Sequence, residues 1–163
     1  MNVKDAVRFS LANADFLAKC YLSDITPPEM LVRATPDSNH IAWQIGHLIT
    51  SEYRLVETAA PGTMPPLPQG FVERHSKDTA GSDKAADFLT KEDYLNLAKT
   101  VRASTLRALD RVSDADLDRP VAGRVPPFVK TAGDCFMLAG NHWILHCGQW
   151  VILRRKLNRP RQF

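Results

Sequence analysis

Four stretches of the chain repeat apolar residues at the spacing of an amphipathic helix, and proline-rich or polar connectors separate them. We expect helices over about 3–22, 38–59, 91–112 and 132–157. Asp37 or Ser38 is the predicted cap of the second helix, and Thr90 that of the third. Segment 61–90 is expected to form one long connection with a short helical turn near 83–89. The pattern predicts an all-α four-helix bundle, in which this connection allows a crossover between helices 2 and 3.

Composition favours one compact domain over residues 1–163. The chain is 44% hydrophobic and 24% charged, which suits a sizeable core. Its net charge of +3, from 21 Lys and Arg against 18 Asp and Glu, is too small to indicate a nucleic-acid partner. Several basic residues gather in the last ten positions, where we expect a solvated helix end with cations near the C-terminal dipole: Arg154, Arg155, Lys156, Arg159 and Arg161.

The three cysteines, Cys20, Cys135 and Cys147, form an odd set without a CxxC spacing. This pattern indicates neither a disulfide framework nor a four-cysteine zinc site, and it favours a reducing cytoplasm. The N-terminus mixes charged and apolar residues, unlike a signal peptide. No run approaches the ~18 apolar residues of a membrane span. We therefore expect a cytoplasmic protein that has no membrane partner.

His142 and His146 stand four residues apart in the fourth predicted helix, so their imidazoles lie one above the other on one face. At ~100° per residue they fall inside an apolar stripe that includes Ala139 and Trp150. A buried imidazole without a partner costs on the order of a few kcal/mol. Ligation of a metal ion would give both rings a partner at once. The alternative is that each is a core histidine bonded to backbone or water.

A third histidine, His47, lies in the second predicted helix. Three neutral imidazoles on two helices can hold Zn, Ni, Cu or Fe and leave a coordination position for water or substrate. His40 lies ~10 Å from His47 along the helix, so we interpret it as a helix-end or pocket-rim residue. His75, in the long connection, is expected to be a solvent residue, although that loop could fold over the site.

Other residues near the histidines have weaker interpretations. Gln44 and Gln149 can orient a group but cannot accept a proton, and Glu52 lies toward the outer part of the inner arc, so we assign no general base. Cys147 should point away from the stripe and serve in packing. Three glycines cost ~1 kcal/mol each inside predicted helices, and close helix approach, ligand access or tight packing would compensate: Gly46, Gly140 and Gly148.

Two motifs resemble those of the DinB-like (DinB/YfiT-type) family, which includes thiol-dependent enzymes. They are Trp43-Gln44-Ile45-Gly46-His47-Leu48 and His142-xxx-His146-Cys147-Gly148-Gln149, the second followed by Arg154-Arg155. The resemblance implies a four-helix bundle with a long crossover connection between helices 2 and 3, often a homodimer. It also implies one divalent metal ion, Zn, Ni, Fe or Mn, held by His47, His142 and His146. Trp143 departs from many relatives, and with Trp150 and exposed apolar residues of the fourth helix it is a candidate contributor to the dimer surface.

Characterised members of the family include thiol S-transferases, thiol-dependent isomerases and proposed hydrolases. The resemblance therefore implies a divalent-metal-dependent enzyme that acts on a small-molecule substrate, with a low-molecular-weight thiol as a further cofactor. A metal with an open position suits either reaction, because it lowers the pKa of a bound water or thiol. Two alternatives stand beside this hypothesis: a noncatalytic metal-binding or stress-associated bundle, and a metal-free bundle whose three histidines bond within the core.

Overall fold

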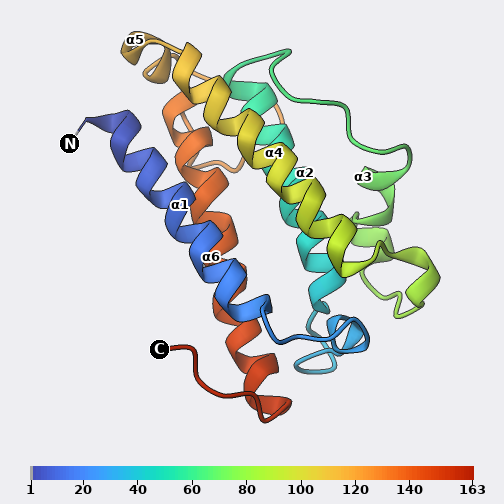
Figure 1. Cartoon of the computed structure of the whole chain (residues 1–163). Coiled ribbons are helices and arrows are strands. Elements are labelled where there is room, and N and C mark those ends of the chain that lie inside the picture. Colours follow the sequence, from blue (N-terminus) through green and yellow to red (C-terminus); the bar gives the residue numbers. More distant parts are fainter. Residues whose placement is uncertain (1) are drawn as a thin grey trace.

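The computed structural model describes residues 2–163, and within them the regular structure is helical, without a β-strand (Figure 1). The predicted all-α class is confirmed. The four long helices are α1 Val3–Leu22, α2 Ile41–Ala59, α4 Lys91–Arg111 and α6 Ala132–Lys156. Short segments lie between them: η1 Pro28–Leu31, α3 Phe71–Arg74, η2 Lys77–Thr79, η3 Ala85–Asp87 and α5 Asp114–Leu117.

Capping side chains determine where three of the long helices begin. Asn2, Thr90 and Thr131 each accept a hydrogen bond from the backbone N–H three residues further on, at 2.8, 3.1 and 3.2 Å. At α1 and α6 the aspartate in that third position bonds back to the capping residue's N–H, which completes a capping box. The predicted bounds of these helices, and Thr90 as a cap, are therefore correct to within one residue.

The predicted start of α2 was wrong, because the helix begins at Ile41 and its cap is His40. His40 Nδ1 accepts the Trp43 backbone N–H at 3.1 Å, and its Nε2 donates to the Ser82 carbonyl at 3.0 Å. Ser38 is unavailable as a cap because its hydroxyl closes a turn with both backbone groups of Thr35. His40 is thus a helix-end residue, as predicted, and it also anchors the long connection.

The long helices pack in a chain of neighbours: α1 against α6, α6 against α2, and α2 against α4. In Figure 1, α2 and α4 run in one direction while α1 and α6 run in the other. Hydrogen bonds agree with the opposed directions of α1 and α4. Lys91, at the start of α4, donates to the carbonyls of Leu22, the last residue of α1, and of Ile25 just beyond it, both at 2.6 Å.

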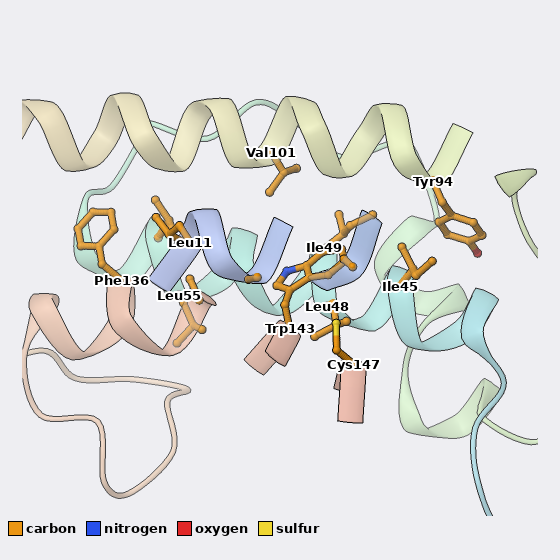
Figure 2. Packing of buried hydrophobic residues seen from close by; sticks show 14 of the residues in the cluster. Leu11, Ile45, Leu48, Ile49, Leu55, Tyr94, Val101, Phe136, Trp143 and Cys147 are labelled. Atoms are coloured by element: carbon orange, nitrogen blue, oxygen red, sulfur yellow. The ribbon is translucent and has the colours of Figure 1, made fainter. Parts of the chain in front are cut away.

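The core draws side chains from all four long helices (Figure 2). Leu11, Ile49, Val101 and Phe136 are each at most 1% exposed and represent α1, α2, α4 and α6 in turn. No helix among residues 2–163 is both long enough and apolar enough to cross a membrane.

The two tryptophans predicted as contributors to a dimer surface lie inside the protein. Trp143 is 5% exposed and Trp150 is 1% exposed. Both indole N–H groups donate to buried side chains of α2, Trp143 to Glu52 and Trp150 to Gln44. A buried polar group needs such a partner, and here the partner lies within the same chain. That expectation was therefore wrong for both residues.

A buried polar cluster joins three helices at mid-height. The Glu52 carboxylate of α2 accepts from Arg102 at 3.0 Å and Thr105 at 2.7 Å, both on α4, and from Trp143 Nε1 at 2.9 Å on α6. Burial raises the pKa of the Glu52 carboxyl, and the Arg102 guanidinium opposes that rise. Glu52 is 1% exposed, so its position near the outer part of the arc was wrong. Its bonds link α2 to α4 and α6 through buried side chains.

The sequence predicted a solvated helix end for the basic tail, and this was wrong for part of it. Arg154 is 3% exposed and pairs with Asp24 beyond α1, and it donates to the Tyr21 carbonyl at 2.8 Å. The hydrogen bond from Arg154 lowers the pKa of the Asp24 carboxyl. Arg159 pairs with Glu29 at 2.7 Å. These pairs attach the end of α6 to the segment that follows α1, whereas Arg155 and Lys156 remain exposed.

Candidate metal centre

Three imidazoles from two helices meet where α2 packs against α6. His47 lies in the first half of α2, and His142 and His146 lie one turn apart in α6. One ring nitrogen from each residue can be chosen so that all three lie within 4.8 Å of one another. Side chains at positions i and i+4 share a helix face, which places the α6 pair together. Packing of α2 on α6 then adds His47.

Gln44 fixes which nitrogen of His146 carries the proton. Trp150 Nε1, which can only donate, lies 2.8 Å from Gln44 Oε1, and Gln44 Nε2 donates to the Asn39 carbonyl at 2.5 Å. These two bonds assign the orientation of the amide. The same Oε1 accepts from His146 Nδ1 at 2.9 Å. His146 Nε2 is therefore the nitrogen with a free lone pair, and it faces His142.

His142 has a similar arrangement. Its Nδ1 lies 3.1 Å from the Ser51 hydroxyl, and its Nε2 lies 3.2 Å from His146 Nε2. When Ser51 accepts from Nδ1, the Nε2 lone pair is directed toward His146. Hydrogen bonds from outside the site that hold the far ring nitrogen are the usual support of histidine ligands. Ser51 and Gln44, both on α2, are positioned for that role.

His47 is oriented by an aromatic neighbour. Its imidazole stacks on the Trp43 indole, with 5.0 Å between ring centroids and 7° between ring planes. The indole N–H of Trp43 donates to the Ser76 carbonyl at 3.2 Å, and this bond connects the stacked pair to the loop before α4. Within residues 2–163, no protein group hydrogen-bonds to a ring nitrogen of His47. A half-buried imidazole without a protein partner, beside two others, fits a metal ligand.

The surroundings keep all three imidazoles neutral at pH 7. Burial lowers the pKa of His142 to about 4 and that of His146 to about 3, and neighbouring imidazoles add to both effects. Burial also lowers the pKa of His47, and the positive charges of Arg54 and Lys77 add to the decrease. Ligation requires the neutral ring, so the three donors are in the protonation state that a metal ion needs.

A cavity of about 740 Å³ opens beside the three rings. His47 and His142 form part of its wall, together with residues of α2 and α6 and segments 72–78 and 124–128. Small-molecule sites in proteins commonly have volumes of a few hundred Å³ or more. Two of the three histidines therefore border a space that admits a small molecule.

His75 was predicted to face solvent, and this was wrong. It is 3% exposed; its Nδ1 donates to the Phe71 carbonyl at 2.7 Å, and its Nε2 accepts from the Tyr94 hydroxyl at 2.6 Å. Burial lowers the pKa of His75 to about 4 and raises that of Tyr94 to about 12. The long connection thus folds over the site, as the second expectation for this loop allowed.

Two of the three helical glycines mark close contacts. A Cβ at Gly46 would lie 2.1 Å from Cδ2 of the His75 ring, and one at Gly140 would lie 2.7 Å from the Ser10 hydroxyl of α1. Gly148 faces open space, so neither contact nor packing explains it. Cys147 is 1% exposed, and burial raises the pKa of its thiol to about 12, which fits the packing role predicted for it.

Sequence reasoning missed two supports of the histidines. Trp43 and Ser51 lie four residues before and after His47, so the helical repeat places all three on one face of α2. A search for polar or aromatic residues at i±4 from His47 would have found both. Their partners, Ser76 and His142, are distant in sequence and had no local signal.

Comparison with known proteins agrees with the motif resemblance. The family model of the DinB superfamily matches residues 12–150, a span that includes His47, His142 and His146. Neither the curated proteins nor the solved structures gave a match to the chain. The matched span covers most of the four long helices. The chain belongs to the DinB superfamily.

Proposed function

We propose that the chain is a divalent-metal-dependent enzyme acting on a small molecule, as a thiol S-transferase or a hydrolase. The observation that carries the proposal is the convergence of three neutral imidazoles, two of which, His47 and His142, line a 740 Å³ cavity. His47, His142 and His146 would hold the ion. Zn, Ni, Fe and Mn are the candidate metals, since ligand type alone does not select among them.

The donor set is that of an open site. Within residues 2–163 the group contains three imidazoles and no carboxylate or thiolate. Structural zinc sites are usually closed by four protein ligands, whereas catalytic sites have three and keep one position for water or substrate. When bound, a divalent ion among neutral ligands lowers the pKa of a coordinated water or thiol.

Neighbouring residues of the chain hold the three imidazoles in orientations and protonation states that suit metal ligands. Gln44 holds the proton of His146 on Nδ1, Ser51 is placed to do the same for His142, and Trp43 restrains the ring of His47. Burial keeps the rings neutral. Such support is characteristic of ligands whose orientation matters for affinity.

The alternative function is a noncatalytic metal-binding or stress-associated bundle. Substitution of Co(II) separates the two classes, because its visible absorption responds to a change of ligands. If a low-molecular-weight thiol or azide shifts the absorption spectrum, the site has an exchangeable position, as an enzyme requires. A spectrum indifferent to both ligands would favour the noncatalytic alternative.

Four further features belong to the same proposal. We interpret the four long helices and segment 60–90 as a four-helix bundle with a long crossover connection, forming one domain over residues 1–163. A homodimer remains a prediction, checked by the mass of the protein in solution. Three free cysteines, two of them buried, support a reducing compartment such as the cytoplasm.

Metal content is the primary test. Elemental analysis of untagged protein should find about one ion per chain, and His47→Ala and His146→Ala should each lose it while remaining folded. His40→Asn is the matched control, since asparagine is a good N-cap and His40 is outside the triad. Wild-type protein that binds none of the four candidate metals under reducing conditions would establish the metal-free alternative.

A further inference from the structure

The lining of the cavity is rich in positive charge. Arg54 of α2, Lys77 of η2 and Arg124 of the connection before α6 all line it, and Asp78 is the one carboxylate in the lining. Two arginines and one lysine against one aspartate leave an excess of two positive charges in the lining, before any metal ion is added.

These three cations have no acidic partner. Within residues 2–163, none of Arg54, Lys77 and Arg124 makes an ion pair, and none donates a side-chain hydrogen bond. Other arginines of the chain do form ion pairs, as Arg33 does with Asp83, with 2.8 Å between the guanidinium nitrogen and the carboxylate oxygen. The donors in the cavity wall are thus available to a ligand.

Two of these positive charges share the cavity with the candidate ligands. Arg54 and Lys77 line the same space as His47 and His142. The same two charges would repel a divalent cation bound by His47. An anion between them and the metal would offset that repulsion, because it attracts both.

The lining also contains apolar side chains. Phe128 is 69% exposed and Leu145 is 65% exposed, yet both border the cavity, along with Leu138. Apolar side chains this exposed gain free energy when a ligand covers them. The cavity lining thus includes both cations without an ion-pair partner and uncovered apolar surface.

We propose that the cavity binds an anionic small molecule with an apolar portion, its carboxylate, sulfonate or phosphate held by Arg54, Lys77 and Arg124. The apolar portion would rest on Phe128 and Leu145. This inference deepens the proposed function, on which it rests, by giving the chemical class of the substrate. Arg54 and Lys77 are substrate-binding residues in this assignment.

Benzoate and benzamide are a suitable probe pair, since they share shape and differ in charge. Their dissociation constants would be measured by NMR titration for metal-free and zinc-loaded protein. Wild type should prefer benzoate in both forms, and Arg54→Gln combined with Lys77→Gln should weaken benzoate binding roughly tenfold while leaving benzamide unchanged. The matched control is Lys99→Gln with Arg155→Gln, which removes two exposed cations that do not line the cavity.

The outcomes separate this inference from the metal hypothesis. A benzoate preference in metal-free protein that the Arg54/Lys77 variant loses and the control retains supports the inference, whatever the metal content. Equal binding of benzoate and benzamide overturns it. A preference that exists only with zinc and survives the Arg54/Lys77 substitutions also overturns it, because the carboxylate would then bind the ion alone, and the proposed function would stand.

Discussion

Gln44 is the residue outside the three histidines on which the candidate site most depends. Its single carbonyl oxygen accepts from His146 and from Trp150, and its amide nitrogen donates to the Asn39 carbonyl. One side chain of α2 thereby satisfies two buried donors of α6. Loss of that oxygen affects both the stability of the helix pair and the orientation of a ligand.

We predict that Gln44→Leu lowers metal affinity about 10- to 100-fold and destabilises the protein by roughly 2–4 kcal/mol, because two buried N–H groups lose their acceptor. Competition with a chromophoric chelator measures the first effect, and urea unfolding the second. Gln149→Leu is the control, since Gln149 is an exposed glutamine of α6. Wild-type affinity in Gln44→Leu would show that His146 needs no such support.

At the scale of elements, the loop that contains α3 and η2 is attached to α2 at two points. The His75 ring packs against Gly46, and the indole N–H of Trp43 donates to the Ser76 carbonyl. Tyr94 of α4 holds the other edge of His75. The loop's position over the cavity thus depends on residue 46 being glycine, which has no side chain to displace the His75 ring.

We predict that Gly46→Ala is destabilising by about 2 kcal/mol, although alanine favours the helix, because its Cβ would displace His75. Limited proteolysis should cut within 71–80 faster than in wild type. Gly148→Ala, in open space, should instead stabilise by roughly 0.5–1 kcal/mol. If adding His75→Ala to Gly46→Ala restores no stability, the clash is not the cause.

Elements with local signals could be predicted, and those with distant partners could not. The apolar repeat and Thr90 give α1, α4 and α6 to within a residue, and the i, i+4 spacing gives the pair on α6. The burial of His75 depends on Gly46 and Tyr94, 29 and 19 residues away, through contacts with no periodic pattern. Glu52 was misplaced because charged residues are rarely buried unless paired, and its partner Arg102 lies on another helix.

For the whole molecule, the histidines set the response to acid. Burial lowers the pKa of His75 and His142 to about 4 and that of His146 to about 3, whereas an unfolded chain protonates histidine near 6.5. Between those values the unfolded state binds more protons than the folded state. The contribution of these histidines to the free energy of unfolding is therefore fully present above about pH 6.5, and it decreases as the pH falls toward 4.

We predict that the free energy of unfolding of metal-free protein falls between pH 6.5 and pH 4.5, with a limiting slope of about 1.4 kcal/mol per pH unit for each of these histidines. Urea unfolding at a series of pH values measures the slope. A dependence of less than one proton over this range would contradict the neutral, buried state of the rings.

The Trp43 indole joins two events that are usually treated separately. One face of it restrains His47, and its N–H holds the loop at Ser76. Displacement of the loop would break the bond to Ser76, and the indole would then lose its fixed orientation. The imidazole stacked on it would gain rotational freedom as a result. The position of the loop and the orientation of His47 are thus linked through one side chain.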